Sequence, residues 1–390
     1  MTMKLKVIFF AIVFLTLFAC KKNNSTSNDP GDNFHTDTSY KTPLSKGINL
    51  SNWFNDYSDP NQFSNRFTDE HFSTLKQLGF TYVRIPIGQY ILFNHDHPSE
   101  LNTTNLAFVE SAVQKAVNNG LAVTLNYHPG SNDFESTLPS STVSQDKLAE
   151  YWKAVANYFK KYSTSQIFFE VYNEPHVASD GSVSYAKTWW TEVQLKLIRA
   201  IRSVATDHFI IAGGESWNSI DGLKLLPVYK QNNIIYNFHF YDPFTFTHQG
   251  ATWAGEAMAK LRDIPYPSTP ENVAPITDTA TDQEVYDIVS WYGQERWNKA
   301  RLEIIINRAV DWRNTNNAAL ICNEFGSYMT FAPRQSRLNL INDVRSLLEE
   351  NNIGWAMWEM DEGFGFINYS NGNRSSFTTD DEVLHALGLK

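Results

Sequence analysis

The sequence predicts an α/β protein that folds as a single (β/α)8 TIM barrel. From Lys46 onward, short and almost continuously apolar runs alternate with longer amphipathic segments. Runs that are apolar on both faces are typical of parallel strands covered by helices on each side. Eight strand–helix units are the number that closes such a barrel. The expected strands are residues 46–51, 82–88, 122–128, 167–174, 209–215, 234–241, 319–326 and 354–360.

Amphipathic segments between these runs predict the helices. The segments at 69–79 and 105–120 each end in a glycine, which is a common residue at the C-terminus of a helix. A doubly wound open sheet is the alternative architecture, but no glycine-rich phosphate loop follows the first strand. Further helices are expected at 147–162, 184–205, 284–315, 334–352 and 381–390.

One segment interrupts the alternation of strands and helices. Residues 262–283 follow the sixth expected strand and are rich in proline and threonine. A long loop at this point would lie on the rim at the C-terminal ends of the strands. We therefore expect this segment to form one wall of a cleft.

The composition excludes one class of partner. The chain of 390 residues has a net charge of −10, and no basic cluster lies beyond its N-terminus. Nucleic-acid phosphates require a basic face, so we expect no nucleic-acid partner. The 11 Trp, 18 Tyr and 26 Phe can build either a core or a surface for stacking ligands. We expect a monomer.

The N-terminus has the pattern of an export signal. Lys4 and Lys6 precede an apolar run at 7–19, which is too short to span a bilayer as a mature helix. The run ends in "LFAC", which resembles a bacterial lipobox in which Cys20 becomes lipidated. An ordinary secretory signal cut nearby is the alternative. We expect a lipoprotein signal peptide at 1–19, a flexible tether at 20–43 and the barrel at 44–390, anchored to a bacterial membrane through Cys20 and facing the periplasm or the cell surface.

Cysteine and histidine patterns predict neither a disulfide nor a metal site. Cys20 and Cys322 are the only cysteines in the sequence. If Cys20 carries lipid, Cys322 has no partner within the chain. The "NHDHP" stretch at 94–98 has His-x-His spacing but lacks a third placed ligand, so we interpret it as a solvated loop.

Polar residues gather at the C-terminal ends of the expected strands, where barrels of this kind carry their chemistry. Burying unpaired charge is costly, so these residues are expected to meet one another or a ligand. Two carboxylates on facing strands suit acid–base or nucleophilic work on a sugar bond, at about 5–5.5 Å apart for a retaining and about 6.5–9.5 Å for an inverting reaction. The residues are Arg84, His128, Asn173, Glu174, His239, Tyr241, Glu324 and Trp358.

The neighbours of the two glutamates suggest a division of roles. Arg84 could hold Glu324 ionised, and Tyr241 could donate a hydrogen bond to the same carboxylate. Glu174 would then need a raised pKa to act as an acid. Each neighbour also has a purely structural reading: Arg84 as an ion pair, His239 as a core histidine and Tyr241 as a packing residue.

The strand motifs as an ordered set resemble a known family. The stretches "GINLSNW", "YVRIPI", "LNYHP", "FEVYNEP", "FHFYDPF", "CNEFG" and "WAMWEM" are similar to those of glycoside hydrolase family 5, the cellulase family of clan A. The similarity extends from Gly47 to about Asp361. Two positions depart from the pattern: Asn323, where the family often has Gly, and Asn126, where Asp is frequent.

The resemblance implies a role for each strand-end residue. Glu174 would be the acid/base and Glu324 the nucleophile of a retaining hydrolase that needs no cofactor. Asn173 would bind the sugar 2-hydroxyl. The remaining implied roles are lining of the cleavage subsite by His128 and His239, positioning of the nucleophile by Arg84 and Tyr241, and a sugar platform at Trp358.

Other acids and aromatic residues are open to more than one interpretation. Glu170 is expected to form a supporting ion pair, Glu215 to have a role at the rim, and Asp361 and Glu362 to be loop polar residues. Aromatic faces that could hold further sugars are provided by Trp53 and Trp217 first, then by Phe244 and Trp253, and each could instead pack under a loop.

The resemblance favours a retaining endo-β-1,4-glucanase acting on a polysaccharide. A β-mannanase, a xyloglucanase, a mixed-linkage glucanase or an exo-β-1,3-glucanase would use the same eight residues. The alternative from another class is a noncatalytic glycan-binding lipoprotein, which the presence of both glutamates disfavours. Strand motifs do not distinguish endo from exo action, because loop lengths close the cleft.

Overall fold

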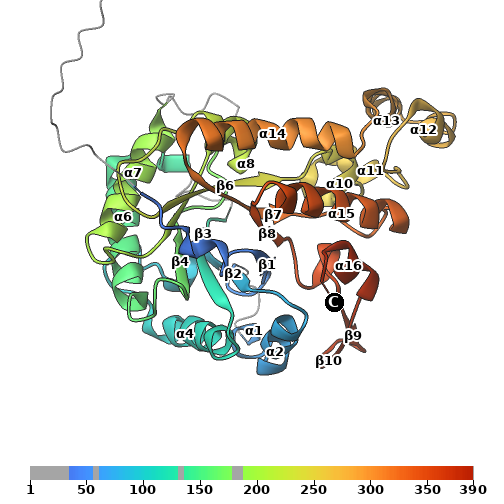
Figure 1. The fold of residues 1–390 in the computed structure, drawn as a ribbon. Coiled ribbons are helices and arrows are strands. Elements are labelled where there is room, and N and C mark those ends of the chain that lie inside the picture. The colour runs from blue at the N-terminus through green and yellow to red at the C-terminus, as the bar shows by residue number, and fades with distance from the viewer. Residues whose placement is uncertain (1–34, 56–60, 131–135, 178–187, 390) are drawn as a thin grey trace, which may run out of the picture. The chain divides into compact units, whose positions relative to one another are not determined.

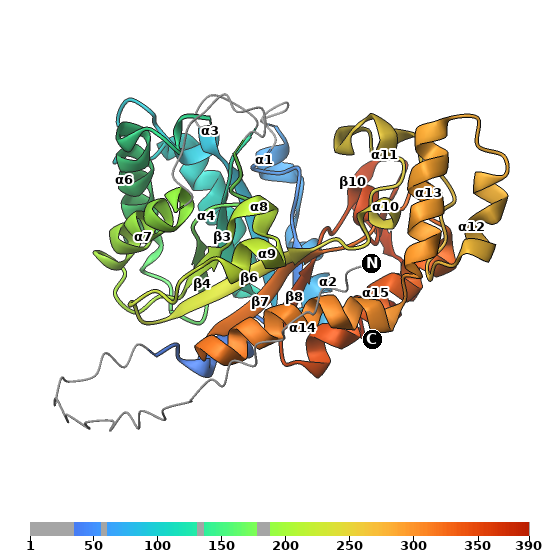
Figure 2. The ribbon, with the colours of Figure 1, turned by 90° about the horizontal axis from the view of Figure 1, so that it is seen from above.

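A computed structural model describes residues 35–55, 61–130, 136–177 and 188–389. Eight parallel strands close into a barrel in sequence order, with β8 pairing back onto β1. Figures 1 and 2 show the helices arranged around this barrel, which confirms the predicted (β/α)8 fold. The strands are β1 Lys46–Asn49, β2 Tyr82–Gly88, β3 Ala122–His128, β4 Ile167–Glu170, β5 Ile210–Gly213, β6 Ile234–Phe240, β7 Ala319–Phe325 and β8 Gly354–Met357.

Side chains near the N-terminal ends of the strands fill the interior of the barrel. Tyr82, Phe168, Ile211 and Ile321 belong to one buried cluster there. A Cβ atom on Gly47 would lie 2.3 Å from the Tyr82 ring, so glycine is needed where that ring crosses β1. The outward side chains pack in a second and larger cluster with the helices. Burial on both faces explains why the strands are apolar throughout.

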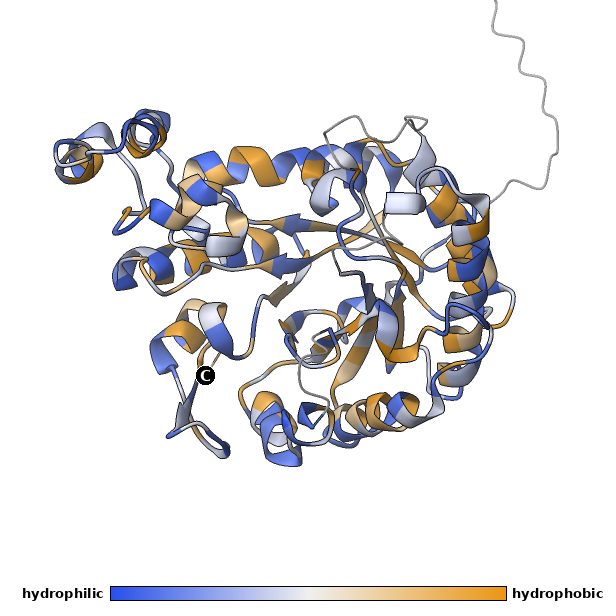
Figure 3. Ribbon diagram, turned by 180° about the vertical axis from the view of Figure 1, so that it is seen from behind, coloured by the Kyte–Doolittle hydropathy of each residue, from blue (hydrophilic) through white to orange (hydrophobic). Residues whose placement is uncertain are grey.

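Helices cover the outside of the barrel. Figure 3 shows both hydrophobic and hydrophilic segments along most of these helices, as expected for helices with one face on a core. Among the described residues, no helix is long and apolar enough to cross a membrane. The longer helices are α2 Asp69–Gln77, α4 Thr103–Asn118, α6 Thr142–Phe159, α7 Trp189–Arg202, α12 Pro270–Thr277, α13 Gln283–Glu295, α14 Lys299–Asn316 and α15 Arg334–Glu350.

Short elements complete the chain. After β8 the chain forms a two-stranded hairpin, which the sequence pattern did not predict, and it then enters α16. These elements are η1 Thr38–Lys41, α1 Gln62–Asn65, α3 Gln89–Leu92, α8 Glu215–Asn218, α9 Ile220–Lys224, α10 Phe244–Thr247, η2 Thr252–Ala254, α11 Glu256–Lys260, η3 Glu362–Phe364, β9 Ile367–Ser370, β10 Asn373–Thr379 and α16 Asp381–Ala386.

Two expectations for the segment between β6 and β7 were wrong. The helix expected at 284–315 is two helices, because Arg296 adopts a left-handed conformation at the end of α13 and Asn298 caps α14. The segment at 262–283 is not one long loop, because it contains α12. Thr269 caps this helix and Pro270 begins it, which is a favourable start for a helix.

Candidate active site

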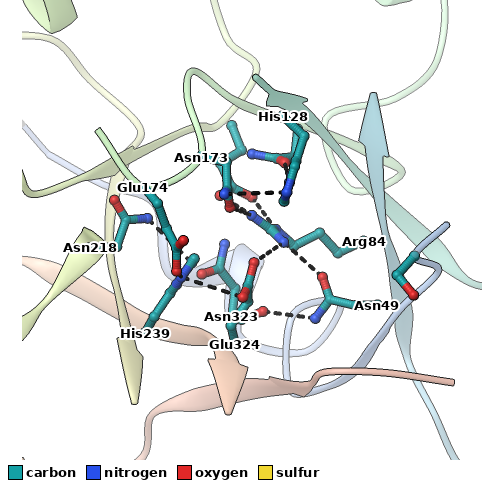
Figure 4. A network of polar contacts seen from close by, with 12 residues as sticks. Asn49, Arg84, His128, Asn173, Glu174, Asn218, His239, Asn323 and Glu324 are labelled. Atoms are coloured by element: carbon teal, nitrogen blue, oxygen red, sulfur yellow. Dashed lines mark hydrogen bonds and ion pairs between the residues drawn. The ribbon is translucent and has the colours of Figure 1, made fainter. Parts of the chain in front are cut away.

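A cleft of about 1020 Å³ lies at the C-terminal ends of the strands. It is lined by seven of the eight predicted strand-end residues, while the eighth, Arg84, lies buried beneath them. The wall expected from 262–283 comes instead from the segment between Phe244 and Ala254. Figure 4 shows the central side chains converging from different strands.

The two glutamates of the predicted pair lie close together. Carboxylate oxygens of Glu174 and Glu324, together with a ring nitrogen of His239, lie within 4.8 Å of one another. Inverting hydrolases hold their carboxyls about 6.5–9.5 Å apart to accommodate a water molecule. The separation seen here fits direct attack by one carboxylate, which is the retaining arrangement.

Arg84 lies beneath the cleft and connects residues of the site through hydrogen bonds. Its Nη1 donates to Glu324 Oε1 at 2.5 Å, and its Nε and Nη2 donate to the two oxygens of Glu170 at 2.7 and 2.8 Å. Nη1 also donates to Asn49 Oδ1 and Nη2 to Asn173 Oδ1, both at 2.8 Å. The guanidinium is fully buried, so every one of these bonds replaces lost hydration. The supporting ion pair predicted for Glu170 is confirmed.

Glu324 has the surroundings of a carboxylate held in one orientation. Tyr241 donates its hydroxyl to Glu324 Oε2 at 3.0 Å, so both carboxylate oxygens accept a hydrogen bond. Burial raises the pKa of the Glu324 carboxyl, and the Arg84 guanidinium opposes that shift. Burial also raises the pKa of Tyr241 well above its usual value, so the hydroxyl remains a donor.

Glu174 follows β4 rather than belonging to it. The strand ends at Glu170, four residues earlier than predicted, and Glu174 itself has φ 49°. Its side chain is 28% exposed to the cleft, and Oε1 lies 2.7 Å from His239 Nδ1. Burial of the carboxyl raises its pKa to about 7, against the opposing charge of Arg84. A carboxyl with this pKa can hold a proton near neutral pH and release it during reaction.

His128 and Asn173 form the side of the cleft beside Trp358. The amide Nδ2 of Asn173 lies 3.4 Å from His128 Nε2, while His128 Nδ1 lies 3.0 Å from Asn126 Oδ1. The His128 ring stacks on Trp358 at 5.9 Å between centroids. Because the Asn173 oxygen accepts from Arg84, the amide nitrogen lies on the side of His128, where it can donate to a sugar hydroxyl.

Comparison with known proteins agrees with this geometry. The family model "Cellulase (glycosyl hydrolase family 5)" matches residues 36–363. The chain belongs to this family. It is therefore a glycosyl hydrolase of the cellulase family, and its closed barrel is the fold of solved family members.

Endoglucanases are among the relatives of this family 5 protein. Endoglucanase C of Acetivibrio thermocellus is 32% identical over 321 residues, which cover 80% of this chain and 90% of that protein. Endoglucanase 3 of Fibrobacter succinogenes is 31% identical, covering 83% of this chain and 50% of that protein.

Solved structures resemble the barrel over most of its length. Endoglucanase Cel5A from Thermotoga maritima has a TM-score of 0.71 at 27% identity, covering 89% of this chain and 98% of that one. The cellulose synthase subunit Z (CcsZ) of Clostridioides difficile has a TM-score of 0.69 at 25% identity, covering 88% and 99%.

The rim aromatics of this family 5 chain divide into exposed and buried residues. Trp217, Phe244 and Trp253 line the cleft and are 56%, 45% and 62% exposed. Trp217 stacks on His176 at 4.7 Å. The expectation for Trp53 was wrong: only 1% of it is exposed, because it packs between Phe54 and neighbouring core rings and donates Nε1 to backbone carbonyls.

The other acidic residues considered in the sequence have defined contacts in the structure. Glu215 accepts a hydrogen bond from Trp189 Nε1 at 2.9 Å. Asp361 was wrongly expected to be a loop polar residue. It is fully buried and pairs with Arg66 and Arg374, which fastens the β9–β10 hairpin to the barrel. Glu362 is partly exposed and lines the cleft.

The His-x-His stretch only partly matches its interpretation. His97 is exposed, but His95 is partly buried and stacks on Phe93 at 4.2 Å between centroids.

Several site residues were missed because no local pattern marks them. Asn49, Asn237 and Asn218 contact the charged network from strand or turn positions. His248 lines the cleft and stacks on Phe244. Glu359 accepts a hydrogen bond from Ser51 and also lines the cleft. The one available signal was position, since each lies in or just after an expected strand or in the loop that follows it.

Proposed function

We propose that this chain is a retaining endo-β-1,4-glucanase. The observation that carries the proposal is the approach of the Glu174 and Glu324 carboxylates to within 4.8 Å, with Arg84 on one and His239 on the other. The endoglucanases among its relatives support the same activity. The open cleft with exposed aromatic residues suits a polysaccharide chain.

In the first step, Glu324 attacks the anomeric carbon from below while Glu174 protonates the departing glycosidic oxygen. Arg84 and Tyr241 hold the Glu324 oxygens, so the attacking atom is aimed before substrate arrives. A covalent glycosyl–Glu324 ester forms, and the bond to the leaving sugar breaks. Asn173 donates to the 2-hydroxyl, an interaction that strengthens in the transition state.

In the second step, Glu174 is ionised and takes a proton from water. The water oxygen attacks the anomeric carbon, the ester to Glu324 breaks, and the sugar leaves with its original configuration. Trp358 forms the floor beneath the reacting sugar. The His128 ring stacks on the Trp358 ring and holds that ring from the side.

A panel of polysaccharides tests this proposal. We expect internal cleavage of carboxymethyl cellulose, seen as a fall in viscosity that precedes the release of much reducing sugar. Lichenan, glucomannan, xyloglucan and laminarin distinguish the other substrates. Glucomannan is included because a Thermotoga maritima Cel5A structure with a TM-score of 0.72 holds mannotriose. A chain that binds these glycans and cleaves none of them would instead be a noncatalytic glycan-binding protein.

We also propose that the protein is exported and anchored through lipid on Cys20. The support is the sequence of residues 1–20, which lies outside the described residues. Labelling with radioactive palmitate in a bacterial host tests this. The label is expected on the protein that has Cys20 and is expected to be absent from Cys20→Ala. Equal labelling of the two chains would exclude Cys20 as the anchor.

A further inference from the structure

The short element α8 (Glu215–Asn218), between β5 and α9, is not a regular helix, because residues 216–218 form a left-handed turn. Ser216, Trp217 and Asn218 have φ values of 60°, 58° and 52°. This region is disfavoured for residues with side chains, most of all for bulky ones, and three in succession persist only where their surroundings hold them. The turn places Trp217 over the cleft and buries Asn218 completely. Such strain at a cleft suggests that the buried amide has a task.

The Asn218 amide occupies a site built for it. A Cβ atom on Gly213 would lie 2.6 Å from Asn218 Oδ1 and 2.6 Å from Asn237 Oδ1, so glycine in β5 makes room for both amides. Asn218 Nδ2 lies 3.0 Å from Asn237 Oδ1 and 3.3 Å from His239 Nε2. Figure 4 shows the Asn218 amide directed toward His239, behind Glu174.

The donor and the acceptor in each of these hydrogen bonds can be assigned by starting from Glu170, at one end of the hydrogen-bond network. Both carboxylate oxygens of Glu170 accept hydrogen bonds from Arg84, so Glu170 meets its other neighbours as an acceptor. Asn237 Nδ2, at 3.3 Å from Glu170 Oε1, must therefore donate, and Asn237 Oδ1 is the atom left facing Asn218. Asn218 Nδ2 donates to that oxygen, and its second N–H donates to His239 Nε2.

A ring nitrogen that accepts leaves the proton on the other nitrogen. His239 is neutral near pH 7, because burial lowers its pKa. Its proton then sits on Nδ1, which lies 2.7 Å from Glu174 Oε1 and donates to it. With Oε1 accepting this bond, the proton that Glu174 transfers belongs on Oε2. The opposite tautomer would place a lone pair against Oε1 and draw the acid proton toward His239.

We propose that Asn218 is a positioning residue for acid catalysis: its amide fixes the His239 tautomer that donates to Glu174 and so directs the transferable proton toward the leaving oxygen. This inference rests on the proposed hydrolase function. It also gives the strained turn a purpose, since one segment buries this amide and presents Trp217 to the cleft.

Leaving-group dependence tests the proposal. Asn218→Leu keeps the side-chain shape without a donor, and Asn218→Gly suits the left-handed backbone and protects against a folding failure. We expect kcat/KM for cellotetraose to fall by about tenfold or more in Asn218→Leu, a loss of about 1.4 kcal/mol or more in transition-state stabilisation. For 2,4-dinitrophenyl β-cellobioside, whose leaving group needs no proton, kcat/KM is expected to change by less than about threefold.

Matched controls separate this role from a structural one. Asn317→Leu changes another left-handed asparagine, at the end of α14 and outside the cleft, and should leave both kcat/KM values unchanged. Equal losses on the two substrates in both Asn218 variants, or no loss in either variant, would overturn the proposal. A wild-type chain that cleaves neither substrate would instead refute the hydrolase function.

Discussion

Arg84 Nη1 lies 2.5 Å from Glu324 Oε1, and the same guanidinium holds Glu170 through its other two nitrogens. One buried cation thus pairs with two carboxylates in the floor of the site. The arrangement holds the proposed nucleophile in place and makes the stability of the barrel depend on the same residue. Function and folding are coupled at this point.

The first prediction is that Arg84→Met lowers both stability and kcat. Removing one partner leaves Glu170 and Glu324 buried without compensation, and breaking a buried ion pair in this way costs about 3–5 kcal/mol. The free energy of unfolding is measured in urea. As a control, Arg334→Met removes a half-exposed pair with Asp380 and should cost about 1 kcal/mol or less. Equal losses in the two variants would contradict this account of Arg84.

The second prediction concerns the alkaline side of the pH profile. Glu174 must be protonated to act as an acid, and burial raises its pKa to about 7. Its charged neighbours are Arg84, Glu170 and Glu324, with His176 and His239 beside them. Below about pH 7 the proton is present, and above it kcat/KM should fall about tenfold per pH unit.

The acidic side of the profile has the opposite sign. Glu324 must be ionised to attack, and burial raises its pKa, so activity should be lost as the pH falls through a value above the usual carboxyl range. The two apparent pKa values belong to the coupled pair. Dinitrophenyl β-cellobioside needs no proton on its leaving group, so its kcat/KM in the wild-type enzyme should keep the acidic limb and lack the alkaline one. An alkaline limb of equal steepness on this substrate would show that a group other than the Glu174 acid controls it.

Much of the fold could be predicted because the strands are buried on both faces. Continuous apolar runs such as Ile167–Glu170 identify barrel strands without any knowledge of their partners. The C-terminal ends of the strands were harder to predict. Val171 and Tyr172 are as apolar and as buried as the strand before them, and Val171 N still donates to Ile211 O of β5, so nothing in the composition marks the end of β4 at Glu170.

The candidate site was predictable where a residue type is rare in a strand, as for Arg84 and Glu324. It was not predictable where backbone conformation decides, as for Asn218, whose left-handed φ leaves no signature in the sequence. Trp53 illustrates the same limit. An aromatic residue just after a strand has the same sequence pattern whether its ring faces solvent or the core.

The third prediction separates the two glutamates by the stereochemistry of azide products. In Glu324→Gly, azide enters the space left by the nucleophile, and the product from a β-glycoside should be the α-glycosyl azide. In Glu174→Ala, azide attacks the glycosyl–Glu324 ester and should give the β-glycosyl azide from dinitrophenyl β-cellobioside. Without azide, turnover of Glu324→Gly should be below about one thousandth of wild type. Products of the same configuration from both variants, assigned by NMR, would refute the division of roles.

The fourth prediction contrasts two tryptophans that the sequence treats alike. Trp217 is 56% exposed over the cleft, so Trp217→Ala should raise KM for cello-oligosaccharides about fivefold, the loss of roughly 1 kcal/mol of stacking, and leave the melting temperature nearly unchanged. Trp53 is 1% exposed, so Trp53→Ala should instead lower the free energy of unfolding by about 3–5 kcal/mol, because it empties a packed site. Calorimetry and initial rates on cellotetraose measure the two effects in the same samples. If Trp217→Ala lost stability while KM stayed constant, its ring would be a packing element rather than a sugar platform.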